Sequence, residues 1–166
     1  MNLKVIINTS EGELLVELYR ETSPITVDNF LNYIDKKFYD GTIFHRVINN
    51  FMIQGGGYET GMVEKNTDAP ILNEADNGVS NLTYTIAMAR TNEPHSATAQ
   101  FFINVADNKF LDFKSKRDDE YGYCVFGKVI GGMDTVNKIK AMPTEKFGFH
   151  ADVPSEEISI ISITRQ

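Results

Sequence analysis

The chain has 166 residues, of which 42% are hydrophobic, and its formal net charge at pH 7 is -7. This length and composition predict one globular domain, residues 1–166, that is large enough to bury its own core. The acidic balance and the scattered Lys and Arg residues argue against a nucleic-acid partner, and no stretch is apolar enough to make a membrane partner expected.

A hairpin and a helix are expected at the beginning of the chain. Apolar side chains occupy alternate positions in residues 3–9 and 13–19, which predicts two strands joined by a short turn. Ser23 is a suitable N-cap, Pro24 suits the first helical position, and the apolar residues that follow have helical spacing. We expect this helix to end at about Lys37.

Residues 44–57 form an apolar stretch around one permanent cation, Arg46. Successive side chains of a strand point to opposite faces, so Arg46 would be held beside apolar neighbours. Such an arginine is either paired structurally or used chemically, and the pattern alone leaves both readings open. The glycines at 55–57 lack the spacing of a phosphate-binding loop, and we expect them to allow close approach of another backbone segment.

Short strands and long loops are expected in the second half of the chain. An irregular segment continues to about Asn81, and loops of this length are usually functional or tightly packed. Residues 82–90 predict a strand with small side chains on one face, which leaves room for a ligand. Residues 99–105 predict a strand that places Gln100, Phe102 and Asn104 on one face as a pocket wall.

The remaining elements complete an all-β pattern. We expect a strand at 123–129, a helix at 133–140, a loop to Pro154, and a closing strand at 158–164 whose change of phase after Ile160 predicts a bulge or burial on both faces. About eight short strands with two helices indicate a barrel or a sandwich, and we favour a closed barrel because closure leaves no apolar edge exposed.

Several kinds of chemistry lack their usual residues. The three histidines are far apart in the sequence and there is no Cys-x-x-Cys pair, so we expect no metal and no cofactor. The Gly-x-Ser-x-Gly motif is absent, and Cys124 lies between residues typical of a strand core, which predicts a buried structural thiol. The lone cysteine excludes an internal disulfide. Together with the lack of an apolar signal region, it predicts a cytoplasmic location.

Longer motifs then carry a resemblance to a known family. They are FHRVI at residues 44–48, FMIQGGG at 51–57, MA at 88–89, QFFI at 100–103, FLD at 110–112 and VFGKV at 125–129. In this order they resemble the cyclophilin family of peptidyl-prolyl cis-trans isomerases over nearly the whole chain. Residues 88–104 and 122–124 are similar to its compact bacterial cytoplasmic branch, the isomerase B branch.

The resemblance implies an eight-stranded antiparallel closed barrel capped by two α-helices, with the active site in a groove on its outer face. It implies that Arg46 is catalytic, and it assigns the substrate-binding groove to the following residues: Phe51, Met52, Phe102 and Leu111 in the proline pocket, Gln54, Ala89, Arg90 and Gln100 along the peptide backbone, and Phe110 and Tyr123 at the rim. The implied partners are proline-containing peptides and unfolded or folding proteins, and we expect a monomer.

Three positions depart from the best-known members. Phe110 stands where many have tryptophan and Tyr123 where many have histidine. Loss of the indole donor predicts weakened binding of cyclosporin. Tyr84 stands where relatives often carry glycine, and the sequence suggests no reason.

The implied roles also constrain the local geometry of the hairpin. A plain two-residue turn at residues 49–50 would place Arg46 opposite Ile53 and Gln54 on the other face. A shared groove requires Arg46 and Gln54 together, so we predict a longer turn or a bulge. Two other functions stay open: a proline-peptide binding or holdase module, and a barrel that carries a small ligand in its lumen.

Overall fold

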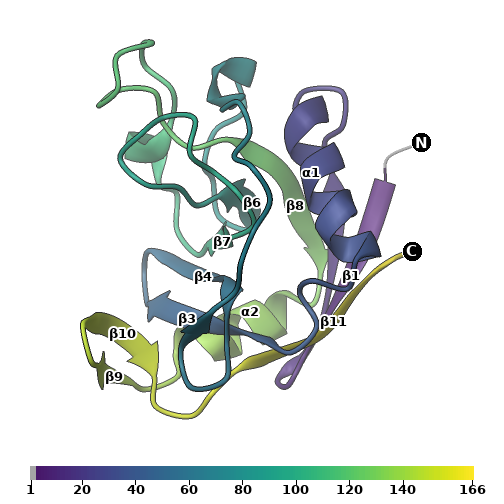
Figure 1. Cartoon of the computed structure of the whole chain (residues 1–166), viewed down its shortest axis with the longest axis vertical. Coiled ribbons are helices and arrows are strands. Elements are labelled where there is room, and N and C mark those ends of the chain that lie inside the picture. Colours follow the sequence, from purple (N-terminus) through teal and green to yellow (C-terminus); the bar gives the residue numbers. More distant parts are fainter. Residues whose placement is uncertain (1–2) are drawn as a thin grey trace.

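The computed structural model describes residues 3–166, so the first two residues of the predicted domain lie outside the described part. Within it, eight antiparallel strands close into a barrel, in the order β3-β11-β1-β2-β8-β6-β7-β4 and back to β3 (Figure 1). The strands are β1 (Leu3–Thr9), β2 (Gly12–Leu18), β3 (Thr42–Ile48), β4 (Met52–Glu59), β6 (Thr85–Met88), β7 (Phe101–Asn104), β8 (Val125–Gly131) and β11 (Ser159–Arg165). The predicted closed barrel is confirmed.

Apolar side chains fill the barrel interior. In the β1–β2 hairpin, alternate residues such as Val5, Ile7 and Val16 have no exposed surface. They belong to one buried cluster that also holds Phe44 and Phe101 from the other side of the barrel. This filled interior argues against a ligand carried in the lumen.

Two α-helices cap the barrel, α1 (Pro24–Asp35) and α2 (Met133–Lys140), and Figure 1 shows them apart from one another on it. The bounds of α2 match the prediction, whereas α1 ends at Asp35, two residues before Lys37. Ser23 occupies the N-cap position of α1, but its hydroxyl donates to the carbonyl oxygen of Val125 at 2.9 Å. Glu74 caps the helix instead, since its carboxylate accepts the Thr26 N–H at 2.7 Å.

The turn between β3 and β4 settles the predicted register problem. Ile48 pairs with Met52, so three residues form the turn, and Asn50 has a left-handed φ of 65°. Arg46 then pairs directly with Gln54, while Phe44 pairs with Gly55, which leaves His45 as the extra residue of a bulge. The prediction of a longer turn or a bulge is confirmed, and both are present.

Two other sequence features acquire a physical reason. A Cβ at Gly55 would lie 2.8 Å from the carbonyl oxygen of Ile43, so the expected close backbone approach is confirmed. Tyr84 has φ of 71°, a left-handed conformation that glycine adopts most easily, which is a physical reason for the glycine that the family resemblance implies at this position. Its hydroxyl donates to Oδ1 of Asn137 on α2 at 3.1 Å, so the tyrosine tethers β6 to that helix.

Several strand boundaries differ from the predictions. The structure shortens 82–90 and 99–105 to β6 and β7, and both strands are buried on both faces because loops cover the sheet there. β8 begins two residues after the predicted 123 and ends two residues after the predicted 129. In β11 the pairing skips Ile161, which confirms the predicted bulge.

The prediction missed five short elements. They are β5 (Val63–Glu64), β9 (Thr144–Phe147), β10 (His150–Pro154) and the 3-10 helices η1 (Ala75–Asn77) and η2 (Lys109–Leu111). All four residues of β9 are exposed, so the sequence of this strand has no alternation of apolar and polar residues from which it could be predicted. The β9–β10 hairpin therefore lies within the stretch that was predicted as a loop.

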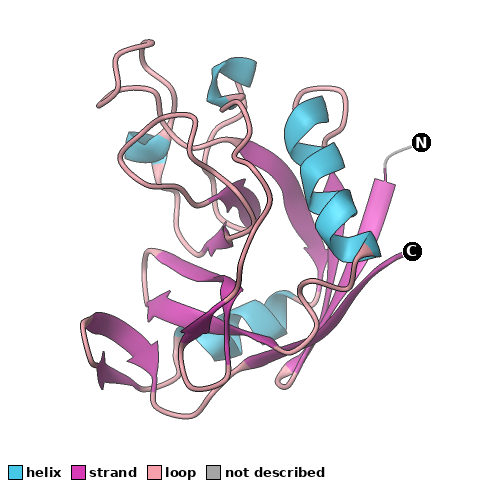
Figure 2. Cartoon of the chain, in the orientation of Figure 1, coloured by secondary structure: helices cyan, strands magenta, loops and turns pink. Residues whose placement is uncertain are grey.

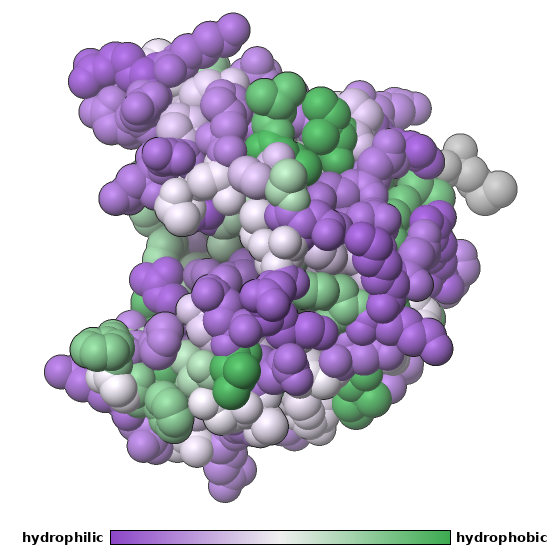
Figure 3. Space-filling view, in the orientation of Figure 1, coloured by the Kyte–Doolittle hydropathy of each residue, from purple (hydrophilic) through white to green (hydrophobic). Residues whose placement is uncertain are grey.

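Loops gather on one side of the barrel, where Figure 2 shows long irregular segments around the ends of β6 and β7. The surface in Figure 3 is mainly hydrophilic, and its outline is notched between these loops and the lobe that contains β9 and β10. Among the helices of residues 3–166, none combines the length and hydropathy needed to cross a membrane.

Candidate active site

Nine of the predicted site residues line a single cavity with a volume of about 140 Å³. They are Arg46, Phe51, Met52, Gln54, Ala89, Arg90, Phe102, Leu111 and Tyr123. The hairpin of β3 and β4 supplies one wall, and the ends of β6 and β7 with the loop after β7 supply the other. A dry protein cavity of about 150 Å³ accommodates benzene, so this one has room for a small apolar ring.

The floor of the cavity is a small apolar cluster separate from the barrel interior. Met52, Ala87, Phe102 and Val125 are buried together, with Leu111 among the residues packed against them. The predicted row of small side chains on β6 contributes Ala87 here, where a larger residue would fill the space above the sheet. The floor is therefore shaped by small residues as much as by aromatic ones.

Arg46 lies at the polar edge of this cavity with few partners. Its side chain is exposed, and its Nη1 donates to Oε1 of Gln54 over a long 3.4 Å. Gln54 in turn donates from Nε2 to Oε1 of Gln100 at 3.0 Å, which fixes the orientation of the Gln54 amide. The salt bridges found within residues 3–166 do not include Arg46, so a structural ion pair does not explain it.

The neighbouring His45 points to the other side of β3, where it is 6% exposed and its ring lies 4.4 Å from that of Tyr58. Burial, with smaller contributions from the nearby charges of His150 and Arg46, lowers the pKa of His45 to about 4. Within the described chain its Nδ1 atom has no hydrogen-bond partner. His45 is thus neutral near pH 7 and does not line the cavity.

Gln100 and Phe110 are the predicted site residues that lie just outside the cavity. Gln100 reaches it through its hydrogen bond to Gln54. Phe110 is 64% exposed and stacks on Phe51, with ring centroids 5.8 Å apart. Gln100 therefore supports the edge of the cavity, and Phe110 extends its rim.

A buried amide network beneath the site was missed by the sequence reasoning. Asn108 donates to the carbonyl oxygen of Phe51 and to Oδ1 of Asn104, both at 2.8 Å. Asn104 donates to Oδ1 of Asn81 at 3.1 Å, and Asn81 donates to Asp112. Alternation placed Asn104 on the pocket face, but it is fully buried and ties together the loops that carry Phe51 and Leu111. Amides that follow apolar segments were the only signal available.

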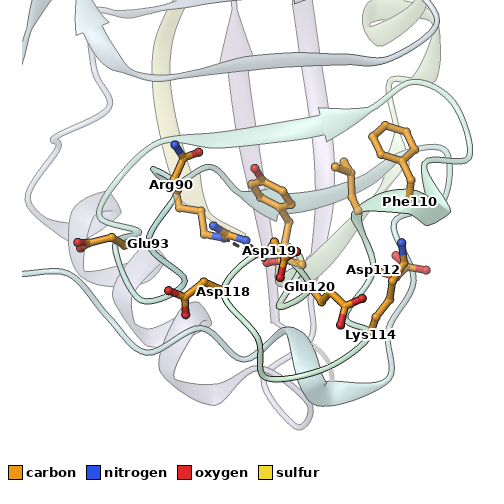
Figure 4. A pocket seen from close by; sticks show the side chains of 12 residues that line it. Arg90, Glu93, Phe110, Asp112, Lys114, Asp118, Asp119 and Glu120 are labelled. Atoms are coloured by element: carbon orange, nitrogen blue, oxygen red, sulfur yellow. Dashed lines mark hydrogen bonds between the residues drawn. The ribbon is translucent and has the colours of Figure 1, made fainter.

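A second, larger groove of about 510 Å³ adjoins the cavity and shares Arg90, Leu111 and Tyr123 with it. Figure 4 shows Arg90 on one side of this groove and Phe110 on the other, with acidic side chains around it. These are Glu93, Asp112, Asp118, Asp119 and Glu120. Lys114 is the other positively charged residue that lines the groove, and Figure 4 shows it away from Arg90.

The guanidinium of Arg90 lines both hollows, and each of its three nitrogens donates a hydrogen bond to the protein. Its Nε and Nη2 donate to the carbonyl oxygen of Gly122 at 3.1 and 2.9 Å, and its Nη1 donates to that of Thr91 at 2.8 Å. Its Cζ atom lies 4.4 Å from the centre of the Tyr123 ring, which meets Phe102 edge-on.

Other kinds of chemistry find no suitable group near the cavity. In the part of the chain that the structure describes, no three His, Cys, Asp or Glu side chains are grouped to hold a metal ion. Cys124 is buried as predicted, and burial raises the pKa of its thiol. The cavity thus offers apolar walls, one available cation and amides, and its lining holds no cysteine, serine or histidine.

Comparison with known proteins gives consistent matches. The model of the family "Cyclophilin type peptidyl-prolyl cis-trans isomerase/CLD" matches residues 4–165. Peptidyl-prolyl cis-trans isomerase B of Escherichia coli K12 is 54% identical over 160 residues, which cover 96% of this chain and 98% of that protein. A peptidyl-prolyl cis-trans isomerase of Acinetobacter baylyi is 56% identical over 162 residues, covering 98% of this chain and 85% of the relative.

Solved structures agree with these sequence matches. A cyclophilin type isomerase of Cryptosporidium parvum superposes with a TM-score of 0.82 at 26% identity, covering 100% of this chain and 98% of its own. A second structure of that protein, determined in the presence of the dipeptide Ala-Pro, gives a TM-score of 0.80 at 27% identity, with 98% of each chain covered.

Proposed function

Since the chain belongs to the cyclophilin type peptidyl-prolyl cis-trans isomerase family and is an isomerase of X-Pro peptide bonds, we propose that Arg46 is its catalytic residue. The substrate is a polypeptide whose proline ring enters the 140 Å³ cavity. Phe51, Met52, Phe102 and Leu111 form the apolar walls around that ring.

The reaction needs a hydrogen-bond donor at the proline nitrogen. Resonance across the amide makes rotation slow, with a barrier of about 18–20 kcal/mol. In the twisted transition state this resonance is lost, and the nitrogen regains a lone pair that can accept a hydrogen bond. A guanidinium donor stabilises it by roughly 1.5–3 kcal/mol, which is about ten- to a hundredfold in rate.

The availability of Arg46 is the single observation that carries the proposal. Among residues 3–166, the one protein group that shares a hydrogen bond with Arg46 is Gln54, through a long 3.4 Å contact at the edge of an apolar cavity. A donor that is not committed to protein groups can bind the lone pair of the nitrogen without first breaking a strong hydrogen bond. The other donors of its guanidinium can therefore reach the amide of a bound X-Pro segment.

The rest of the rate enhancement comes from positioning the substrate. The dry walls hold the proline ring and remove water from the carbonyl group, while Gln54, Ala89, Arg90 and Gln100 lie where they can hold the peptide backbone. Phe110 and Tyr123 form the rim. Because Phe110 lacks the indole N–H, cyclosporin would bind with weakened affinity.

The substrates in the cell are proline-containing peptides and unfolded or folding proteins. We place the protein in the cytoplasm, in keeping with its single free cysteine, and propose that residues 1–166 act as one monomeric isomerase domain. Its charge of -7 disfavours a nucleic-acid partner, and we propose no membrane partner.

The test is an NMR exchange measurement on a short X-Pro peptide, with and without protein. The wild type should accelerate cis-trans exchange, with a rate nearly flat from about pH 6 to 9 because arginine keeps its charge throughout. Arg46→Ala should reduce the acceleration strongly while far-UV circular dichroism stays unchanged.

Three results would contradict the proposal. A rate that falls with an ordinary histidine titration would point away from Arg46. Unfolding of Arg46→Ala would make Arg46 a structural residue. Binding of the peptide without faster exchange would favour the holdase alternative, which needs the pocket but not the cation.

A further inference from the structure

The side chain of Arg90 connects the segment after β6 to the segment before β8. Arg90 follows β6, and its Nε and Nη2 both donate to the carbonyl oxygen of Gly122, at 3.1 and 2.9 Å. Nη1 donates to the carbonyl oxygen of Thr91 at 2.8 Å. Figure 4 shows this side chain reaching across one side of the groove toward the opposite segment. The planar fork of arginine suits such paired contacts, which a lysine could not reproduce.

The acceptor of this fork is held in place from several directions. The carbonyl oxygen of Gly122 also accepts a hydrogen bond from Nδ2 of Asn73 at 3.0 Å. Gly122 has φ of 78°, and a Cβ there would lie 2.6 Å from the carbonyl carbon of Asp112. Only glycine therefore fits where the chain turns this carbonyl toward Arg90.

Tyr123, the next residue, transmits the contact to the apolar cavity. Its ring has the Arg90 guanidinium at 4.4 Å on one side and meets Phe102 edge-on at 5.8 Å, with an interplanar angle of 78°. Its backbone N–H donates to the carbonyl oxygen of Leu111 at 2.9 Å. Phe102 and Leu111 both line the cavity, so the position of the Tyr123 ring sets the width of the cavity on this side.

We propose that Arg90 is a positioning residue, which clamps Gly122 and fixes Tyr123 as a wall of the proline pocket. In place of a direct hold on the peptide backbone, the side chain of Arg90 then acts on substrate binding through Tyr123, and it does not donate to the reacting amide. This inference rests on the proposed function of the cavity. The acidic side chains of the neighbouring groove do not hold the guanidinium: none of the salt bridges between described residues joins Arg90 to a groove carboxylate, so backbone carbonyls and the Tyr123 ring hold it.

The kinetic test compares two variants of Arg90 on the X-Pro peptide. Arg90→Gln removes the fork and the charge, and KM should rise about five- to tenfold while kcat stays within about twofold. Arg90→Lys keeps the charge over Tyr123 but offers no fork, so it should recover less than half of the lost affinity. Complete recovery by lysine, or an unchanged KM in Arg90→Gln, would overturn the clamp.

Arg117→Gln is the matched control. Arg117 is an exposed arginine of the segment between η2 and β8, which also holds Gly122 and Tyr123, and it pairs with Asp119 at 3.2 Å. Its removal changes the net charge by the same amount as the removal of Arg90. The clamp requires KM to stay unchanged in this variant. A rise equal to that of Arg90→Gln would mean that loop charge, and not positioning, determines the affinity, and would overturn the proposal.

A spectroscopic readout separates this inference from the proposed function. The chain has seven tyrosines, and ring-labelled tyrosine signals can be assigned by comparison with Tyr123→Phe. Without any peptide, the Tyr123 signal should shift and broaden in Arg90→Gln but not in Arg117→Gln. In the wild type, the Arg90 Nε–H should exchange slowly with solvent, which needs no variant to fold.

The outcomes are distinguishable. If the wild type fails to accelerate exchange, the proposed function fails, while the tyrosine and Nε–H signals still test the clamp. If the wild type is active but the Tyr123 signal stays in place and the Arg90 Nε–H exchanges as fast as in a free arginine, the clamp is overturned alone.

Discussion

The two walls of the candidate site each carry an arginine, and the two side chains have opposite surroundings. Arg46 on β3 is exposed and has one long contact of 3.4 Å, with Gln54. Arg90 after β6 makes three hydrogen bonds to backbone carbonyls and covers the Tyr123 ring. The first guanidinium thus has most of its donors free of contacts with the described protein groups, whereas the second uses three donors on backbone carbonyls. The donors that remain free, and not the charge, are the reason why we propose Arg46 and not Arg90 as the catalytic arginine.

The two walls are also built differently behind these residues. The Arg46 wall is a strand hairpin whose bulge buries His45 on the far side. The Arg90 wall combines the ends of β6 and β7 with loop segments that are held by the carbonyl of Gly122 and the amide of Asn81, and the amide of Asn108 ties these segments to the carbonyl of Phe51 on the other wall. A rigid strand can present a donor with few supports, but a loop needs many hydrogen bonds to present an apolar ring.

The largest expected effect is a loss of catalytic efficiency when the guanidinium of Arg46 is replaced. In Arg46→Lys the charge is kept, but an ammonium on a flexible stem does not present the same donors, so kcat/KM should fall about ten- to a hundredfold. The free energy of unfolding should stay within about 0.5 kcal/mol of the wild type. Exchange NMR and urea denaturation measure the two quantities on the same samples.

A matched substitution on the other wall sharpens this result. Arg90→Lys should mainly raise KM, whereas Arg46→Lys should mainly lower kcat, because only Arg46 is assigned to the transition state. If both variants change the same parameter by the same factor, the division of roles between the walls is wrong.

The second effect is a change in the free energy of unfolding with pH, and its cause is His45, the residue next to Arg46 on β3. The pKa of His45 is about 4 in the folded protein, because the ring is buried, against an ordinary 6.5 in the unfolded chain. Between pH 6.5 and 4 the unfolded state therefore binds a proton at His45 that the folded state does not bind. The free energy of unfolding is unaffected by His45 above pH 6.5 and decreases as the pH falls from 6.5 toward 4. Between pH 7 and 5 the loss should be about 2 kcal/mol.

Urea denaturation at several pH values checks this linkage. His45→Gln removes the titrating group, so the drop in unfolding free energy between pH 7 and 5 should shrink by about 2 kcal/mol. Between about pH 6 and 7, where His45 already begins to affect stability, the catalytic rate of the wild type should stay level. An equal drop in both proteins would show that other groups cause the acid sensitivity.

Much of the fold was predictable because its signals are local. Alternation identified β1 and β2, the phase change identified the bulge at Ile161, and the bounds of α2 were predicted correctly. The roles implied by the family resemblance also predicted a longer turn or a bulge at residues 44–57, since a shared groove for Arg46 and Gln54 allows no plain two-residue turn, and the structure has both.

The parts that were missed depend on contacts between distant segments. The cap of α1 comes from Glu74, which is 48 residues away from Thr26, and no local pattern marks it. The exposed strand β9 has no apolar alternation. Arg90 lines the cavity, as eight other predicted site residues do, but the use of its donors depends on the carbonyl of Gly122, 32 residues further along the chain.

The smallest effect should be the clearest contrast between the walls, because it requires no substrate. Arg90→Ala removes three hydrogen bonds and a cation over a ring, so the free energy of unfolding should fall by about 1–1.5 kcal/mol. Arg46→Ala removes one long contact and should cost less than about 0.5 kcal/mol. Urea denaturation of both variants at pH 7 gives the difference. If Arg46→Ala costs as much as Arg90→Ala, the donors of Arg46 are also engaged within the folded protein, and the contrast on which its catalytic role depends disappears.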